Sequence, residues 1–224
     1  VKIEKEKQRP RQSIMVGNTI LLLSPHTDDA ELGCGATIAK LIREGKKVYY
    51  AAFSACEQSV IEGFPKDILI HEVKEATAAL GIDPNNLFLY RYEVRTFNYR
   101  RQEILDDLIR LREDLKPDTV LMPCLHDIHQ DHKTMAEEAL RAFKFCNVFC
   151  YELPWNNLNF NTAAFEVVSE EDAQAKVNAL GKYKSQAHRP YANEEFLRSQ
   201  LRMRGVQVSR RYAEVFEVVR MISE

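Results

Sequence analysis

Short apolar runs alternate along the chain with longer segments in which apolar residues recur at helical spacing. Four consecutive aliphatic residues, 20–23, predict a strand that is buried on both faces of a sheet. Residues 31–44 show the apolar spacing of a helix, and Gly45 follows as its stop. This strand-then-helix pattern recurs along the chain, and it favours parallel strands joined by crossover helices.

The same reading extends to the rest of the chain. Further strands are expected at 48–53, 87–90, 119–123, 148–152, 165–168 and 213–220. Helices are expected at 67–80, at 102–115, from an Asp131 N-cap to 145, from a Ser169 cap to 183, and from 193 onward. We therefore predict an α/β fold: a doubly wound, mainly parallel Rossmann-like sheet with helices on both faces. It forms a single domain over residues 1–224, of which 1–16 are mostly charged or polar and are expected to be a flexible arm.

Ionisable side chains gather just after two of the expected strands. The first strand is followed by His26, Asp28, Asp29 and Glu31, and the fourth by His126, Asp127, His129, Asp131 and His132. In the usual doubly wound strand order, 3-2-1-4-5, strands one and four are neighbours, and ligands bind beyond their carboxyl ends. Catalytic zinc sites usually take three histidine or carboxylate ligands and keep one position open for water. Both clusters are thus predicted to share one metal-binding crevice.

Composition narrows the function classes without selecting one. The chain has 224 residues, 45% hydrophobic and 29% charged residues, and a formal net charge of −2, which is typical of one globular domain. The near-neutral charge argues against a nucleic-acid partner, and no apolar run approaches the roughly 20 residues that span a bilayer. The first eighteen residues show no secretory apolar segment, and five cysteines without a C-x-x-C pair indicate reduced thiols. A cytoplasmic protein is expected, and whether it forms a homo-oligomer is left open.

Two motifs resemble those of a known family. The stretch Pro25-His-Thr-Asp-Asp-Ala-Glu-Leu-Gly33 resembles the P-H-P-D-D-x-E signature of the PIG-L/LmbE-like zinc deacetylases. His129-Gln-Asp-His132 is similar to their second signature, H-P-D-H. The resemblance implies a Rossmann-like enzyme that removes N-acetyl groups from N-acetylglucosamine-type sugars and their conjugates.

The same resemblance assigns roles to individual residues. It implies that His26, Asp29 and His132 bind Zn²⁺, although Fe²⁺ or another divalent ion would also suit these ligands. It makes Asp28 the general base, and it makes His129, oriented by Asp131, the group that stabilises the oxyanion. A carboxylate beside His129 would raise its pKa and favour the imidazolium form.

Some positions depart from the family pattern or carry a less specific signal. Thr27 and Gln130 replace prolines, and residues 68–75 lack the arginine that often holds the sugar in the family, so the glycan specificity is not fixed. Four arginines after the third strand could bind a phosphate or carboxylate on the substrate: Arg91, Arg95, Arg100 and Arg101. Trp155 could stack on a sugar ring. Glu31 is expected to be a helix-dipole partner, and His126 and Asp127 are expected at the rim of the crevice.

Other functions stay open beside the sugar deacetylase. An amidase acting on a non-sugar or thiol-conjugate amide would use the same metal chemistry. A non-catalytic metal- or sugar-binding module is a third reading, and the intact Asp28 and His129 argue against it. A dinucleotide-binding domain is rejected because the turn after the first strand lacks G-x-G-x-x-G and is acidic.

Overall fold

The apolar runs form strands, and the amphipathic segments form helices, in the computed structural model, which describes residues 12–223. The strands are β1 (Thr19–Ser24), β2 (Lys47–Ala52), β3 (Leu87–Leu89), β4 (Thr119–Met122), β5 (Asn147–Tyr151), β6 (Ala164–Val168) and β7 (Tyr212–Arg220). The helices are α1 (Asp29–Arg43), α2 (Ile68–Leu80), α3 (Arg101–Leu115), α4 (Gln130–Ala142), α5 (Glu170–Leu180) and α6 (Glu194–Gln207). The predicted order of elements is thus confirmed.

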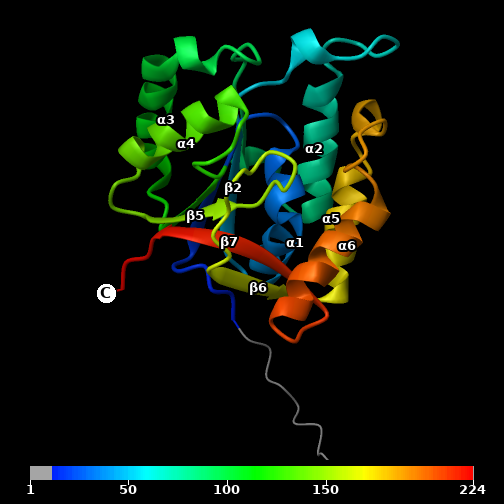
Figure 1. The fold of residues 1–224 in the computed structure, drawn as a ribbon. Helices are drawn as coiled ribbons and strands as arrows, with labels where there is room; N and C mark the ends of the chain where they lie inside the picture. Colours follow the sequence, from blue (N-terminus) through cyan, green and yellow to red (C-terminus); the bar gives the residue numbers. More distant parts are fainter. Residues whose placement is uncertain (1–11, 224) are drawn as a thin grey trace, which may run out of the picture.

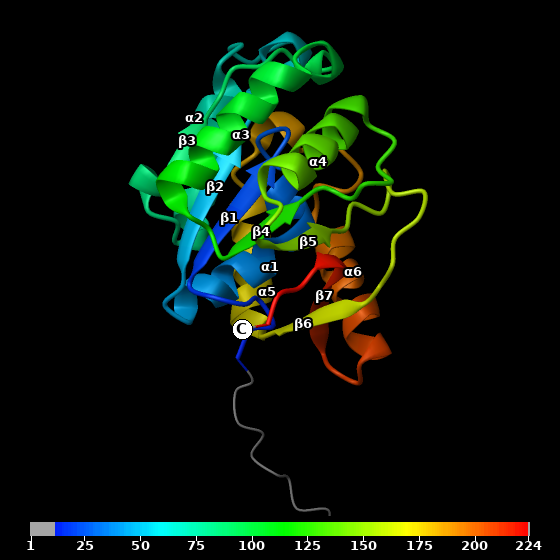
Figure 2. The ribbon, with the colours of Figure 1, turned by 90° about the vertical axis from the view of Figure 1, so that its left-hand side faces the viewer.

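The strands form one seven-stranded sheet in the order β3-β2-β1-β4-β5-β7-β6 (Figure 2). The first five strands pair in parallel and in the predicted order, with β1 beside β4. The last two strands pair antiparallel, and β7 lies between β5 and β6. The winding therefore reverses between β1 and β4, and this is the crevice at which both ionisable clusters were expected.

Helices cover both faces of the sheet (Figure 1). Helices α1, α2 and α5 pack together on one face, and α3 packs against α4 on the other. The position of β1 between two cores explains why its sequence is apolar throughout. Ile20 and Leu22 belong to the core beneath α1, whereas Leu21 and Leu23 belong to the core beneath α3 and α4. Both faces of this central strand exclude water, as parallel sheets require.

The expected arm is corrected in part. Residues 1–11 lie outside the described residues, but the end of the arm packs on the domain. Met15 is 1% exposed, and the Ser13 hydroxyl donates to Glu166 at 2.6 Å. The buried side chain of Met15 and this half-buried hydrogen bond outweigh the polar character of the surrounding sequence.

Two helix starts also differ from the expectation. Helix α1 begins at Asp29, two residues earlier than predicted. The N-cap of α4 is His129, whose ring nitrogen accepts the backbone N–H of Asp131, so Asp131 lies in the first turn instead of capping it. In the described part of the chain, no helix is both long and apolar enough to span a bilayer.

Candidate metal centre

Two buried tyrosines hold the loop between β1 and α1 in place from the side of the core. The hydroxyl groups of Tyr50 and Tyr183 donate to the carbonyl oxygen of Thr27 at 2.9 and 2.7 Å, and both also contact the Glu31 carboxyl group. Glu31 is fully buried, and this burial raises its pKa to about 8. Glu31 lies in the first turn of α1, but its role differs from that of the expected helix-dipole partner, because it contacts the two tyrosine hydroxyls and a pKa of about 8 leaves it mostly uncharged at neutral pH. The loop therefore presents His26, Asp28 and Asp29 from a rigid base.

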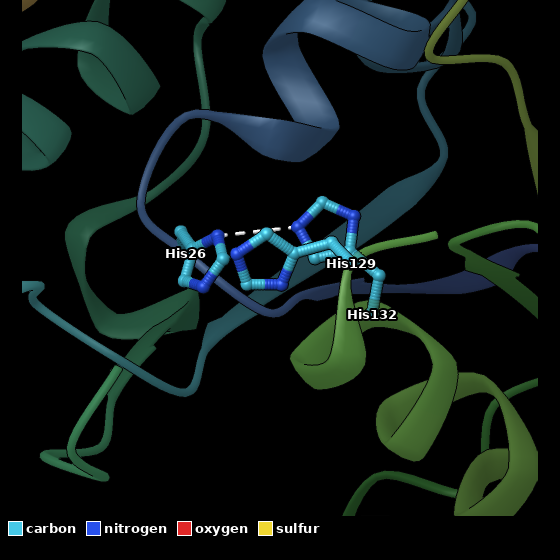
Figure 3. A group of neighbouring side chains, drawn as sticks. All are labelled: His26, His129 and His132. Carbon is cyan, nitrogen blue, oxygen red and sulfur yellow. Dashed lines mark hydrogen bonds between the residues drawn. The ribbon is translucent and has the colours of Figure 1, made fainter. Parts of the chain in front are cut away.

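Three side-chain atoms from the two motifs meet at one point. Nδ1 of His26 lies 3.1 Å from Nε2 of His132, and Oδ2 of Asp29 lies 3.2 Å from each of these nitrogens. His26 follows β1, Asp29 begins α1, and His132 lies in the first turn of α4. Figure 3 shows the imidazoles of His26 and His132 facing each other across this point, with His129 beside them. The structure thus brings together all three residues that were predicted as ligands.

Buried carboxylates hold the outer nitrogens of both imidazoles. Nε2 of His26 lies 3.0 Å from Asp131, and Nδ1 of His132 lies 2.8 Å from Asp127. Since a carboxylate accepts hydrogen bonds, each ring must donate from its outer nitrogen, which leaves the lone pair of the inner nitrogen facing Asp29. Three acceptor atoms therefore converge at contact distance, and only a cation or protons between them can make this arrangement favourable.

The pKa shifts of these three residues also favour positive charge at the point where their atoms meet. Burial lowers the pKa of His132, but the charge of Asp29 and the hydrogen bond with Asp127 outweigh it and raise the pKa to about 10. The pKa of His26 is also raised, because Asp29 and Asp131 outweigh its burial. Burial opposes ionisation of Asp29, yet His132 and His26 hold its pKa well below the usual range.

Asp28 has a different environment from its neighbour Asp29. No side-chain hydrogen bond joins Asp28 to the three converging atoms, and it lines the cleft in front of them. Burial and the charge of Asp29 raise the pKa of Asp28 to about 6. The two successive aspartates thus differ in their electrostatics: the pKa of Asp29 is lowered, whereas the pKa of Asp28 is raised.

The structure corrects the expected partner of Asp131. Its carboxylate contacts His26 at 3.0 Å and accepts the backbone N–H groups of Arg95 and Phe97 at 2.6 and 3.2 Å, whereas His129 Nδ1 lies 4.0 Å away. Asp131 therefore orients His26, and it joins the metal centre to the loop after β3. Sequence spacing could not reveal this partner, because His26 lies on a different element.

The expected protonation of His129 is also wrong. Burial and the neighbouring rings of His26 and His132 lower the pKa of His129 to about 4. Its Nδ1 accepts the backbone N–H of Asp131 at 3.2 Å, so the neutral ring carries its proton on Nε2. His129 is thus a neutral donor, with one nitrogen fixed by the start of α4 and the other available in the cleft.

The cleft in front of the site has a volume of about 570 Å³ and walls of different chemistry. Trp155 stacks on Tyr191 with ring centroids 4.0 Å apart and an angle of 4° between the planes, and both rings line the cleft. Arg95 and Arg189 also line it. Of the four arginines considered after the third strand, only Arg95 does so, and Trp155 faces the cleft instead of being only a core residue.

The sequence analysis misplaced one residue of the site, Asp127, and missed another, Arg189. Asp127 was expected at the rim, but it is 3% exposed and holds His132, while the neighbouring His126 is exposed. Its position five residues before His132, across a turn, gave the only available signal. Arg189 lies in an irregular segment before α6, and no motif there indicates that it reaches the cleft.

The chain is similar to known proteins over most of its length. An uncharacterised deacetylase of Escherichia coli (strain K12), YaiS, is 32% identical over 180 residues, which cover 74% of this chain and 90% of that protein. The conserved protein TT1542 from Thermus thermophilus has a TM-score of 0.75 at 24% identity, covering 93% of this chain and 97% of its own. The N,N'-diacetylchitobiose deacetylase from Pyrococcus horikoshii has a TM-score of 0.72 at 20% identity, covering 90% and 84%.

At these identities the two solved structures show a shared fold and no more. The family itself is shown at the level of sequence. The family model described as PIG-L, GlcNAc-PI de-N-acetylase, matches residues 21–143, which is more than half of the chain and includes both motifs. Together with the similarity to YaiS, this match shows that the chain belongs to the PIG-L deacetylase family.

Proposed function

We propose that the protein is a zinc-dependent hydrolase that removes an N-acetyl group from an N-acetylglucosamine-type sugar or its conjugate. One observation carries the proposal: His26, Asp29 and His132 place three lone-pair atoms 3.1–3.2 Å from one another. Zinc bonds to nitrogen and oxygen are about 2.0–2.2 Å long, and tetrahedral ligand atoms at that radius lie about 3.3–3.6 Å apart, close to the spacing observed. The donor set and its spacing therefore fit a zinc ion with one position left for water.

A second set of three side chains is less well matched. The nitrogens of His26, His129 and His132 lie within 4.8 Å of one another, which is wider than the set containing Asp29. His129 also has its Nδ1 engaged by the backbone N–H of Asp131. We therefore assign Asp29, and not His129, as the third ligand. The same donors would also accept Fe²⁺, so the metal in the cell is part of what must be tested.

The remaining residues supply proton transfer and charge stabilisation. Bound zinc lowers the pKa of water from 15.7 to about 7 and polarises a carbonyl oxygen. Asp28 lies at the cleft beside the ligand Asp29, where it accepts the proton of the attacking water and passes it to the departing amine. The Nε2–H of neutral His129 donates a hydrogen bond to the oxygen that becomes negative as the amide carbonyl is attacked.

The walls of the cleft support a sugar as the group that carries the amide. The stacked Trp155 and Tyr191 form a flat aromatic wall, against which the apolar face of a sugar ring can pack. A volume of about 570 Å³ accommodates one sugar ring with a substituent. The proposal includes a cytoplasmic location for the enzyme, since all five cysteines are free thiols.

Product analysis tests this function. The purified protein is incubated with N-acetylglucosamine, its glycosides, its nucleotide-linked and lipid-linked forms, and acetylated amino acids and thiol conjugates as non-sugar amides. Acetate and free amine are measured before and after treatment with a chelator, and again after zinc or iron is restored. We expect acetate from one class of amino sugar, loss with the chelator and recovery with zinc.

Two results would favour the rival functions. Release of an acyl group only from the non-sugar amides would make the protein an amidase of another substrate class. A protein that holds one zinc per chain and leaves every amide intact would be a binding module. Unchanged acetate release after the metal has been removed completely would overturn the proposed chemistry.

A further inference from the structure

Helix α1 is interrupted shortly after it begins. The break lies at Cys34, whose φ of −146° and ψ of 28° are not helical. In a regular helix the N–H of Ala36 would donate to the carbonyl oxygen of Leu32. A break leaves carbonyl groups before it and N–H groups after it without their helical partners. Since Asp29 is the first residue of α1, the break separates a short first segment, 29–33, from the rest of the helix.

A buried ion pair from two other elements takes up these backbone groups. Lys176 of α5 donates from Nζ to the carbonyl oxygen of Leu32 at 2.7 Å and to the carboxylate of Glu214 at 2.7 Å. Glu214 of β7 accepts the N–H groups of Ala36 and Thr37 at 3.2 and 2.6 Å. Lys176 is 0% exposed and Glu214 is 4% exposed, so water does not compete for these contacts. The pair thus bonds to α1 on both sides of the break.

Two glycines allow neighbouring side chains to approach the break. A Cβ at Gly33 would lie 2.3 Å from the ring of Tyr151, and a Cβ at Gly35 would lie 3.0 Å from Cγ of Lys176. The ring of Tyr151 is itself fixed, because its hydroxyl donates to the carbonyl oxygen of Leu23 at 3.0 Å. Helix α5 packs along α1 (Figure 1). Packing and the ion pair therefore hold the break at a definite place.

Another buried ion pair on the same helix makes different contacts. Lys40 contacts Glu166 of β6 and donates to the carbonyl oxygen of Val167 at 3.0 Å, and these two hydrogen bonds involve no backbone group of α1. Buried ion pairs often add little stability compared with apolar packing, because desolvation offsets their attraction. The Lys176–Glu214 pair has a further effect, since it supplies the partners that the broken helix requires.

The first segment of α1 is held near both of its ends. Before it, the carbonyl oxygen of Thr27 accepts two tyrosine hydroxyls, and near its end the carbonyl oxygen of Leu32 accepts Lys176. Asp29 lies three residues before Leu32, which is less than one helical turn, so a shift of Leu32 moves Asp29 with it. Functional groups must be held to within about 0.5 Å of their working geometry. A small displacement at the break would therefore reach the metal centre.

We infer that Lys176 and Glu214 are positioning residues for the metal centre: by holding the break in α1, they fix the direction of the Asp29 carboxylate. The inference rests on the proposed function, in which Asp29 is a metal ligand. Lys176 and Glu214 lie beyond residues 21–143, which the family model matches, so α5 and β7 contribute to the site from outside that region.

The zinc affinity of Lys176→Met and Glu214→Gln tests this role. Both substitutions remove a charge and keep a side chain of similar size. We expect each variant to bind zinc roughly 10-fold more weakly than the wild-type protein, as is common when the support of a ligand is altered. Affinity is measured by competition with a fluorescent chelator, at a temperature at which circular dichroism shows that every variant is fully folded.

The other buried ion pair of α1 supplies matched controls. Lys40→Met and Glu166→Gln remove the corresponding members of that pair. Because breaking a buried ion pair leaves one charge without its partner, they should lower the urea midpoint as the test variants do. They should leave the zinc affinity unchanged, since neither residue bonds to the backbone at the break. A general loss of stability would instead weaken zinc binding in both pairs alike.

Hydrogen exchange in the metal-free protein reports on the break directly. The amide groups of Ala36 and Thr37 should exchange roughly 10-fold faster in Glu214→Gln, because their hydrogen bonds to a carboxylate are lost or become bonds to a neutral amide. Glu166→Gln should leave these rates unchanged. If a single variant does not fold, Lys176→Met/Glu214→Gln replaces it in both measurements, because the double variant leaves no unpaired buried charge.

The outcomes are separable from those of the proposed function. Wild-type zinc affinity in Lys176→Met and Glu214→Gln would overturn the inference, and so would an equal loss of affinity in the control variants. A wild-type protein that binds no zinc would overturn both the inference and the proposed metal site. Zinc affinity that depends on Lys176 and Glu214, without acetate release from any substrate, would uphold the inference and refute the deacetylase.

Discussion

The carboxylate of Asp127 lies 2.8 Å from Nδ1 of His132, and its other oxygen accepts the backbone N–H of His129 at 2.8 Å. One buried side chain thus sets both the tautomer of a proposed ligand and the path of the backbone into α4. Partners of this kind commonly change metal affinity by about 10- to 100-fold when they are altered.

Asp127→Asn should weaken zinc binding by about 10- to 100-fold, because an amide no longer enforces a donor at Nδ1 of His132. Competition with a chromophoric chelator measures this affinity. Asp106→Asn, at an exposed position of α3, should leave it unchanged. Equal affinities for Asp127→Asn and the wild-type protein would show that Asp127 does not orient the ligand.

Asp28→Asn should keep about one zinc per chain and lower turnover by roughly 10²–10⁴-fold, the usual contribution of a general base. The variant retains the shape of the side chain but cannot accept a proton. Metal content and acetate release are measured on the same preparation. If zinc disappears together with activity, Asp28 is a ligand and its assignment as base is wrong.

Asp29→Asn and His129→Ala distinguish the two possible ligand sets. We expect Asp29→Asn to lose zinc, because Asp29 contacts both His26 and His132 at 3.2 Å. His129→Ala should keep the metal and lose about 10²–10³-fold in turnover, as removal of a donor to a developing oxyanion does. Zinc loss in His129→Ala with retention in Asp29→Asn would instead favour three histidine ligands.

Tyr183→Phe should destabilise the protein by about 1–3 kcal/mol, because the buried carbonyl oxygen of Thr27 loses a donor and the buried Glu31 carboxyl group loses a hydrogen-bond partner. Urea unfolding followed by circular dichroism measures the change. We also expect lower turnover, since the loop that carries His26 loses one of the two tyrosine hydroxyls that hold it in place. Tyr99→Phe, with its ring 80% exposed, is the matched control and should alter neither quantity.

Asp172 links stability to pH. It accepts hydrogen bonds from Ser169 and Arg43. Burial alone would raise its pKa, but these partners outweigh burial and lower the pKa below the ordinary value of 3.8. A lowered pKa in the folded state adds stability above pH 3.8, and that contribution is lost as the pH falls through the folded value.

Asp172→Asn should therefore cost about 1 kcal/mol at pH 7, and the difference from the wild-type protein should shrink below pH 4. Urea midpoints at several pH values measure it, with Glu113→Gln, which is 65% exposed, as the control. A cost that stays constant down to pH 3 would mean that the charge of Asp172 contributes nothing.

Much of the fold could be predicted from sequence because its signals are local. The apolar run of β1 faces two cores, and the glycine after α2 has a left-handed φ of 89°. Which residues share the crevice followed from strand order. By contrast, the partner of Asp131 and the lowered pKa of His129 depend on distances between elements, which no pattern along the chain records. The position of Arg189 depends on an irregular segment in the same way.

The placement of β7 between β5 and β6 has a consequence for how the molecule is made. Strand β6 leaves the ribosome well before its neighbour, since residues 169–211 lie between them. Until β7 arrives, both flanking strands expose unpaired peptide groups to other nascent chains. Insertion of a late strand between two earlier ones is a distant contact, and such contacts slow folding. We therefore expect the metal-binding end, built from β1 to β4, to assemble first, and the opposite edge of the sheet to be the place where misassembly begins.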